Sequence, residues 1–199
     1  MHLKQTIEEK PIAMQDFDPQ VQVKTLRKVR DSITDPRRRQ ILDNLIEHAA
    51  VEGGGRYHEL MASCSRKRQS YEQWGIGGPA AAQAPQSYAE LEVYYKAVID
   101  SKIWMLHYDL DKVVVGDDEV LMDGVLHQLY PAYLIEPMFQ IKPDPRYRAY
   151  QMTKRLSIVF TFDEDGLSSG EHSYANGPIT AKDLTPVEDR YLPDLFKAA

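Results

Sequence analysis

The first half of the chain carries apolar residues at helical spacing. Asp35 is a favourable N-cap, and Pro36 is favoured at the first position of a helix. The three glycines at 53–55 favour a helix end. Between these signals the apolar positions recur every three to four residues: Ile41, Leu42, Leu45, Ile46 and Ala49. The pattern predicts a helix from residue 36 to residue 52 with one apolar face.

Two more helices are predicted further along the chain. A short one runs from Tyr57 to about Ser65. The other begins at Ser87, which forms a capping box with Glu90, and ends near Ser101. Residues 69–87 between them are rich in glycine, proline and alanine, and this composition indicates a loop, with a short hairpin near Trp74 as the alternative.

Beyond residue 102 the spacing changes to that of β-strands. Strands are predicted near residues 104–115, 119–130, 150–162 and 167–175. The third is the clearest, because its residues alternate between an apolar and a polar face. The prolines within residues 131–148 predict a long loop, and the chain from Pro178 on is expected to be loop with a short helix.

The order of these elements indicates an α+β domain. Helices come first and an antiparallel meander follows, which differs from alternating βαβ units. We divide the chain into an N-terminal extension (1–34), a domain (35–180) and a C-terminal tail (181–199). The extension contains one short predicted helix and is interpreted as a surface tail, with a lid or a dimer arm as the alternative.

Composition narrows the classes of function. The chain has 199 residues, a net charge of -6 and a pI of about 5.5, which argues against nucleic acid as the main partner. The basic clusters 37–39 and 66–68 are short and are interpreted as solvated surface. The single cysteine, Cys64, cannot form an internal disulfide. Neither a membrane span nor a signal-peptide core is present, so a cytoplasmic protein without a membrane partner is expected.

Several segments of the chain form a familiar series. Residues 41–65 read ILDNLIEHAAVEGGGRYHELMASCS, and residues 88–99 read YAELEVYYKAVI. Residues 107–124 read HYDLDKVVVGDDEVLMDG, and residues 156–176 read LSIVFTFDEDGLSSGEHSYAN. In this order and at this spacing they resemble, in turn, the opening helix pair, the third helix, a histidine before a hairpin, and the closing hairpin of SnoaL-like proteins of the nuclear transport factor two superfamily.

The resemblance implies a cone-shaped α+β fold, in which a strongly curved, mostly antiparallel sheet and three helices enclose a pocket. It also implies a small hydrophobic molecule as ligand, no cofactor, and a homodimer that packs through the outer face of the sheet. Members of the family include polyketide cyclases, ketosteroid isomerases and dehydratases, but also binding modules without activity. The chain departs from the pattern at Asn176, where many relatives carry an aspartate, and at the proline-rich segment 131–148.

Two polar residues of the first long helix are expected to face the pocket. With Ile41 at zero and about 100° per residue, Glu52 falls near 20° and His48 near 340°, beside the apolar stripe. A carboxylate in that position is costly unless it is paired or hydrated in a cavity. The alternative is that Glu52 lies on a frayed last turn and reaches water.

A further histidine, His107, is expected near the start of the first long strand. The resemblance implies that His107 is a general base and that Glu52 orients it, since related dehydratases carry a histidine in this place. Imidazole titrates near neutral pH, and a carboxylate partner fixes its tautomer. The alternative is a structural histidine beside Asp109.

Other side chains are candidates for the pocket lining, each with a plain structural role as the alternative: Tyr57, Trp74, Tyr95, Asp123, His127, Arg155, His172 and Tyr174. Among them, Arg155 suits a ligand carboxylate or oxyanion, but equally a surface or dimer salt bridge. His48 and Glu52 have the spacing of a metal-binding pair, but no third ligand is evident, so no metal site is expected.

These observations leave different classes of function open. The first is a cofactor-independent lyase, isomerase or cyclase, with His107 as base, Glu52 as its partner and His48 or a tyrosine as oxyanion donor. The second is a small-ligand-binding protein without catalysis, and the third is a dimerisation module. The sequence does not name a substrate.

Overall fold

The computed structural model describes residues 9–76 and 84–197. Its helices are α1 (Val21–Ser32), α2 (Pro36–Glu52), α3 (Tyr57–Ala62), α4 (Tyr88–Asp100), α5 (Ala132–Phe139) and α6 (Asp194–Lys197). Its strands are β1 (Ser70–Trp74), β2 (Leu106–Val115), β3 (Glu119–Pro131), β4 (Ala149–Phe162), β5 (Ser168–Ala175) and β6 (Leu184–Val187). In the part of the chain that the structure describes, no helix is long and apolar enough to cross a membrane.

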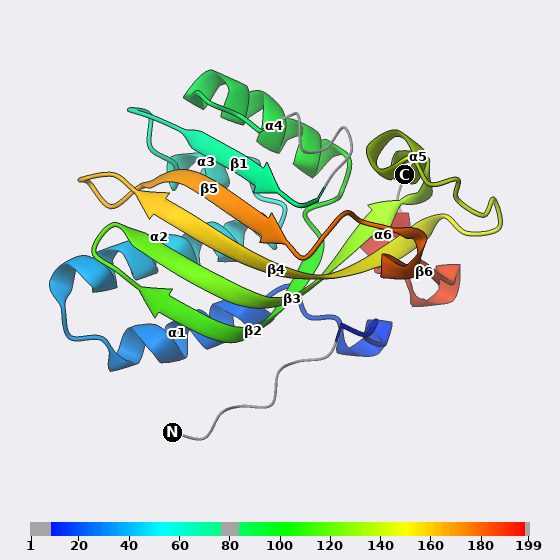
Figure 1. Cartoon of the computed structure of the whole chain (residues 1–199), viewed down its shortest axis with the longest axis horizontal. Helices are drawn as coiled ribbons and strands as arrows, with labels where there is room; N and C mark the ends of the chain where they lie inside the picture. Colours follow the sequence, from blue (N-terminus) through cyan, green and yellow to red (C-terminus); the bar gives the residue numbers. More distant parts are fainter. Residues whose placement is uncertain (1–8, 77–83, 198–199) are drawn as a thin grey trace.

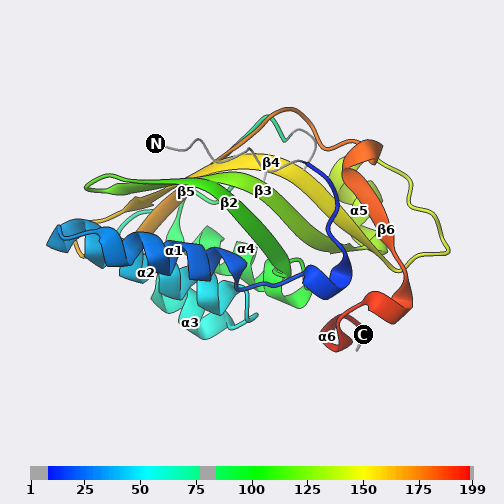
Figure 2. The same ribbon diagram turned by 90° about the horizontal axis from the view of Figure 1, so that it is seen from below.

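The strands form a strongly bent sheet with helices against one face. The strand order is β1-β5-β4-β3-β2, and β6 pairs with β4. All pairs are antiparallel except β1 with β5, which is parallel. Figure 2 shows α1, α2, α3 and α4 beneath the concave face of the sheet. The α+β cone that the sequence predicted is therefore confirmed.

Helix α2 begins and packs as its sequence predicts. The Asp35 side chain accepts a hydrogen bond from the Arg38 amide at 2.9 Å, and Pro36 is the first helical residue. In the apolar stripe of α2, Ile41, Leu42 and Leu45 are fully buried in the main core, and Ile46 packs against it partly buried. Helix α4 has the predicted Ser87 cap, which accepts from the Glu90 amide.

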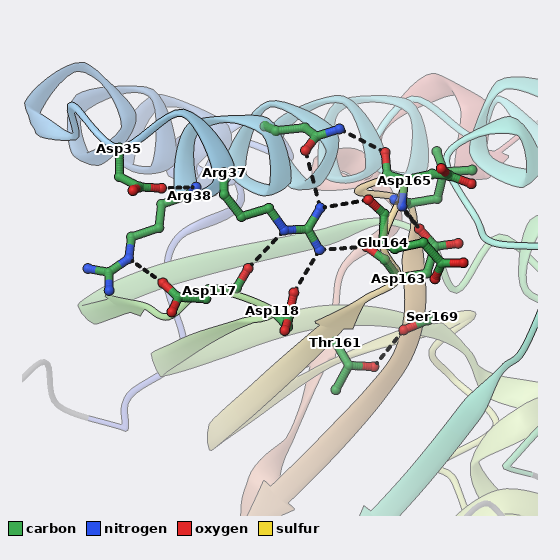
Figure 3. Close-up of polar contacts among 12 residues, drawn as sticks. Asp35, Arg37, Arg38, Asp117, Asp118, Thr161, Asp163, Glu164, Asp165 and Ser169 are labelled. Atoms are coloured by element: carbon green, nitrogen blue, oxygen red, sulfur yellow. Dashed lines mark hydrogen bonds and ion pairs between the residues drawn. The ribbon is translucent and has the colours of Figure 1, made fainter.

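Arg37 joins the start of α2 to two hairpin turns (Figure 3). Its guanidinium binds the Asp118 carboxylate at 2.8 Å and donates to the carbonyls of Asp117 and Asp163. Those residues belong to the β2–β3 and β4–β5 turns, which lie far apart in sequence. The interpretation of the 37–39 cluster as solvated surface was wrong for Arg37, because its side chain cross-links three elements.

Three other elements differ from the sequence prediction. Strand β1 lies in the segment 69–87, which was expected to be a loop or to hold a short local hairpin near Trp74; it pairs instead in parallel with β5, about 100 residues away. Helix α5 lies in the expected loop 131–148 and contains Pro137, but the fully buried Ile135 anchors it to the core. Strand β6 lies in the C-terminal tail and pairs with β4. Tertiary pairing and burial override the local signals in each case.

The N-terminal segment packs on the protein rather than forming a surface tail. Helix α1 includes the predicted helix near residues 23–30, and it buries Val23 and Leu26 in the main core. Before it, the Ile12 amide and carbonyl both bond the Gln151 side chain on β4. We call residues 9–18 the N-terminal strap, because they cross the outer face of the sheet from β4 to β2 (Figure 1).

Candidate functional site

A cavity of about 450 Å³ lies between the concave face of the sheet and the helices. Alternate residues of β4 face it, as the two-residue period of a strand requires: Met152, Lys154, Leu156, Ile158 and Phe160. Helices α2, α4 and α5 supply the opposite walls. The volume falls in the range of small-molecule sites, and most lining side chains are apolar.

Burial of the lining residues shows which end of the cavity is closed. Leu45, His48 and Phe160 are buried, and they form the end near the hairpin turns. Lining residues on α5 are partly or fully exposed, including Leu134, Pro137 and Met138.

Two carboxyl groups line the cavity, and the charge of one raises the pKa of the other. Glu52 comes from the last turn of α2, and Glu171 comes from β5. Burial, followed by the charge of Glu171, raises the pKa of Glu52 to about 8. Burial also raises the pKa of Glu171, although a 2.9 Å hydrogen bond from the Ser173 hydroxyl opposes the shift. Within residues 9–76 and 84–197, no cation or hydrogen-bond donor pairs with the Glu52 carboxyl group.

His48 lies in a directed chain of hydrogen bonds. Ser63 Oγ lies 2.6 Å from the Leu60 carbonyl, which only accepts, so the Ser63 proton is committed there. Ser63 Oγ must then accept from His48 Nδ1 at 2.9 Å. Burial lowers the pKa of His48 to about 4, so the ring is neutral and its Nε2 accepts from the Tyr95 hydroxyl at 3.1 Å.

The chain of hydrogen bonds continues from Tyr95 to Tyr71, and it determines the role of His48. Since Tyr95 donates to His48, its oxygen accepts from the Tyr71 hydroxyl, 3.1 Å away. Both ring nitrogens of His48 are engaged, so it holds Tyr95 in place and has no free proton for an oxyanion. The predicted inward direction of His48 is confirmed, but its expected role as a donor is not supported.

Two more polar groups line the cavity at different places. Tyr94, on α4, is hydrogen-bonded by the Gln73 side chain of β1, and burial raises its pKa. Lys154, on β4, is buried and contacts the Pro178 carbonyl and the Asp183 carboxylate, both at 3.3 Å. Of the described residues that line the cavity, Lys154 is the one cation.

His107 lies on the other side of the sheet from Glu52. Its neighbours in sequence, Leu106 and Tyr108, line the cavity, so strand alternation points His107 outward. The His107 ring accepts from the Asp18 amide at 2.8 Å, lies 3.0 Å from the Asp109 carboxylate and contacts Phe17. The predicted His107–Glu52 dyad was wrong, because the two side chains leave opposite faces of one sheet.

Several predicted lining residues also lie outside the cavity. His127 is buried on the outer face, bonded to Thr153 at 3.1 Å, and burial lowers its pKa to about 4. Arg155 is paired with Asp111 at 2.7 Å and with Asp123 on the same face. None of these three predicted residues, His127, Arg155 and Asp123, lines the cavity.

The remaining candidates are divided between the two sides of the molecule. Tyr95 lines the cavity as predicted. Tyr57 lies on α3, where its hydroxyl donates to the Glu92 carbonyl. His172 and Tyr174 alternate with the cavity residues of β5 and so face outward, as does Trp74 beside them on β1. Trp74 is 56% exposed and Tyr174 44% exposed, so neither is a cavity wall.

The sequence analysis missed Glu171, Tyr94 and Lys154. Lys154 had a readable signal, because it shares the apolar face of the predicted strand with Met152 and Leu156. Glu171 gave none, since it sits in a polar run whose inward side is set by pairing with β4. Among the described residues, no group of three or more His, Cys, Asp or Glu side chains is arranged to hold a metal ion.

Comparison with known proteins identifies the fold. No protein-family model and no curated protein matches the chain. A Shewanella putrefaciens CN-32 protein described as a SnoaL-like polyketide cyclase is 7% identical, with a TM-score of 0.56 over 76% of this chain and 87% of that one. SalBIII, described as an epoxide hydrolase/cyclase-like enzyme in pyran ring formation in polyether salinomycin, is 11% identical, with a TM-score of 0.50 over 74% and 95%.

A computationally designed 17-OHP binder is similar to the same extent. It is 10% identical, with a TM-score of 0.50 over 75% of this chain and 98% of that one. At these identities the likeness is one of fold. The chain has the cone fold of SnoaL-like and nuclear transport factor two-like proteins, as its sequence predicted.

Proposed function

We propose that this protein binds a small, mainly apolar molecule in its cavity and catalyses cofactor-independent proton transfer on it. One observation carries the proposal: two carboxyl groups, Glu52 and Glu171, lie in one apolar cavity, and the pKa of Glu52 is raised to about 8. Perturbed carboxyl groups in a cleft are typical of acid–base sites. They cost stability, so a purely structural cavity has no use for them.

The environments of the two groups separate their roles. Glu171 receives a hydrogen bond from Ser173, which favours its charged form, whereas Glu52 receives none from the described residues. Glu171 therefore ionises first, and its charge holds the proton on Glu52. We therefore assign Glu171 as the base and Glu52 as the acid, the pairing that proton transfer needs.

The proposed reaction follows from these roles. Glu171 removes a proton from a carbon next to a carbonyl group of the substrate. The negative charge moves to the carbonyl oxygen, where the Glu52 proton and the Tyr94 hydroxyl stabilise it. Return of the proton to a different atom is an isomerisation, and attack by the enolate carbon within the same molecule is a cyclisation. The descriptions of the Shewanella protein and SalBIII as cyclase-type enzymes support this class of reaction.

A deuterium-exchange screen tests the proposal. Enolisable ketones and β-hydroxy carbonyls are incubated with the protein in D₂O, and loss of the α-proton signal is followed by NMR. We expect at least one apolar ketone to exchange faster with the protein than without it, and the Glu171→Gln variant to lose that acceleration. If the wild-type protein accelerates no exchange, or if Glu171→Gln exchanges as fast as wild type, the catalytic proposal is wrong.

Binding without catalysis is the second candidate. It is favoured by the apolar majority of the lining and by the designed 17-OHP binder, which shares the fold. In that case ligands would bind to wild-type and Glu171→Gln proteins alike, without proton exchange in either. Calorimetry and the exchange assay on the same ligands separate the two functions.

We also propose a homodimer that packs through the outer face of the sheet. The strap covers this face near β2 and β4, whereas Trp74 and Tyr174 are exposed side by side on β1 and β5. An exposed aromatic pair of this kind is typical of an interface. Light scattering that shows a monomer at micromolar concentration would contradict it.

A further inference from the structure

The cavity separates its charges along β4. Glu171 pairs in register with Phe160, whereas Lys154 lies six positions earlier on the same strand. At about 3.3 Å per residue this is about 20 Å along the strand. Lys154 and Glu171 are therefore placed at well-separated levels of the cavity wall.

The Lys154 ammonium is incompletely satisfied. It has three N–H donors but two partners among residues 9–76 and 84–197, the Pro178 carbonyl and Asp183 Oδ2, each at 3.3 Å. Charged N–H···O bonds are normally about 2.7–2.9 Å long. Asp183 Oδ2 also accepts from the amide and the hydroxyl of Thr180, at 2.7 and 2.9 Å, so the lysine shares its counter-ion.

Burial makes this shortfall costly, because the Lys154 side chain is only 8% exposed. The polar side chain nearest to it along the cavity face of β3, Gln128, is already engaged with other partners. The Gln128 side chain donates to the Ile103 carbonyl at 2.5 Å and accepts from the Tyr130 hydroxyl at 2.8 Å. A ligand oxygen in the cavity would complete the lysine's hydrogen bonds.

We infer that Lys154 is an anion-binding subsite, and that the natural ligand is an elongated apolar molecule with a carboxylate at one end. The carboxylate binds the free N–H of Lys154. The apolar body lies against Leu126, Leu156 and Ile158 and reaches toward Glu52 and Glu171. This inference deepens the proposed function, since it assigns the class of substrate for the same cavity.

The probes are decanoate and its neutral analogue decanamide, whose binding is measured by calorimetry at pH 7. We expect wild-type protein to bind decanoate at least about tenfold more tightly than decanamide, because a hydrogen bond to a charged group contributes about 1.5–3 kcal/mol. Lys154→Met keeps most of the apolar stem and should remove this preference. Equal binding of the two probes by wild-type protein, or no binding of decanoate, overturns the inference.

Asp183→Asn is the matched variant that separates a subsite from a structural ion pair. If Lys154 binds ligand, removal of its competing carboxylate should strengthen decanoate binding and leave decanamide unchanged. If Lys154 merely fastens residues 178–183, both variants should weaken both probes alike, and the inference is wrong.

The test is independent of catalysis. Lysine-dependent decanoate binding without any proton exchange would reject the proposed reaction and keep the subsite. Exchange on neutral ketones, with no preference for carboxylates, would do the reverse.

Discussion

The two faces of the sheet hold polar residues in opposite ways. On the outer face several polar groups have protein partners: His107 Nδ1 accepts from Asp18, although its Nε2 makes no hydrogen bond with the described residues, His127 bonds Thr153, and Arg155 pairs with two aspartates. On the concave face Glu52 has no partner among the described residues, and Lys154 has only distant ones. Paired polar groups stabilise a fold, whereas under-satisfied groups around a cavity are available to a ligand. Together with the cavity itself, this difference supports the concave face as the proposed functional face.

Histidine shows how misleading residue type is without geometry. His107 matched a family position for a general base, yet the N-terminal strap covers it on the outer face. His48 does line the cavity, but Ser63 and Tyr95 occupy both of its nitrogens. The cavity groups that we propose to act on a ligand are instead two carboxyl groups, Glu52 and Glu171, and the lysine Lys154. The comparison therefore predicts that substitutions on the two faces will have different kinds of effect.

The largest expected effect is on the rate at Glu171. Glu171→Gln keeps the size of the side chain and removes the base, so proton exchange should fall by about 10²- to 10⁴-fold. The measurement is deuterium exchange into the best ketone of the screen. Glu72→Gln is the control. Glu72 follows Tyr71, the residue of β1 that pairs with Glu171, but its side chain faces outward and accepts a hydrogen bond from Trp74. If proton exchange fell equally in Glu171→Gln and Glu72→Gln, the proposed functional difference between the concave and outer faces would be wrong.

The next effect concerns stability and pH at Glu52. Folding raises the pKa of this acid from 4.5 to about 8, so the folded state keeps a proton that the unfolded chain releases. The stabilisation from that proton is complete below pH 4.5 and is lost as the pH rises toward 8. Glu52→Gln cannot ionise, so it should become more stable than wild type across this window, by about 2 kcal/mol or more at pH 8.

Urea unfolding of both proteins between pH 5 and pH 9 provides the measurement. The buried histidines His48 and His127, whose pKa values are lowered to about 4, act in the other direction as the pH falls. They are present in both proteins and cancel in the difference. A difference that does not change with pH would mean that Glu52 ionises freely, and the acid role assigned to it would fail.

A smaller effect is expected at His107, and on stability alone. His107→Ala leaves the Asp18 amide without its acceptor and opens a gap beside Phe17, so the free energy of unfolding should fall by about 2 kcal/mol. His107→Asn offers an amide oxygen in a similar place and should lose less. Proton exchange and decanoate binding should be unchanged in both variants. Loss of exchange in a stably folded His107→Asn protein would restore the histidine to the active site.

The sequence allowed the main frame of this fold to be predicted, because its long elements carry strong local signals. The stripe of α2, the Ser87 cap and the alternation of β4 each depend on residues near one another. Strand β1 and helix α5 could not be predicted in this way. The first is set by pairing with β5, and the second by burial of Ile135 despite Pro137.

The direction of the candidate site residues could be predicted only for those on a helix. The angular position of Glu52 and His48 on α2 follows from its apolar stripe, and both residues line the cavity. On a strand, an error of one residue reverses the face. His107 was assigned inward from a family position, although its neighbours Leu106 and Tyr108 are the inward ones. Glu171 required the register of β4 with β5, which no local pattern gives.

The smallest expected effect is at Arg155, and it tests the outer face most directly. Arg155 pairs with Asp111 and Asp123, but its side chain is 23% exposed, so solvent screens both ion pairs. Arg155→Gln should lower the free energy of unfolding by about 1 kcal/mol or less, and high salt should shrink the loss. Asp123 keeps the 2.8 Å hydrogen bond from Ser157, which limits the cost of its lost partner. Calorimetry should show unchanged decanoate binding, because Arg155 and the cavity lie on opposite faces. Arg155→Gln could instead abolish binding of the carboxylate while stability stayed constant. The anion site would then lie on the outer face, and the assignment of ligand binding to the concave face would be wrong.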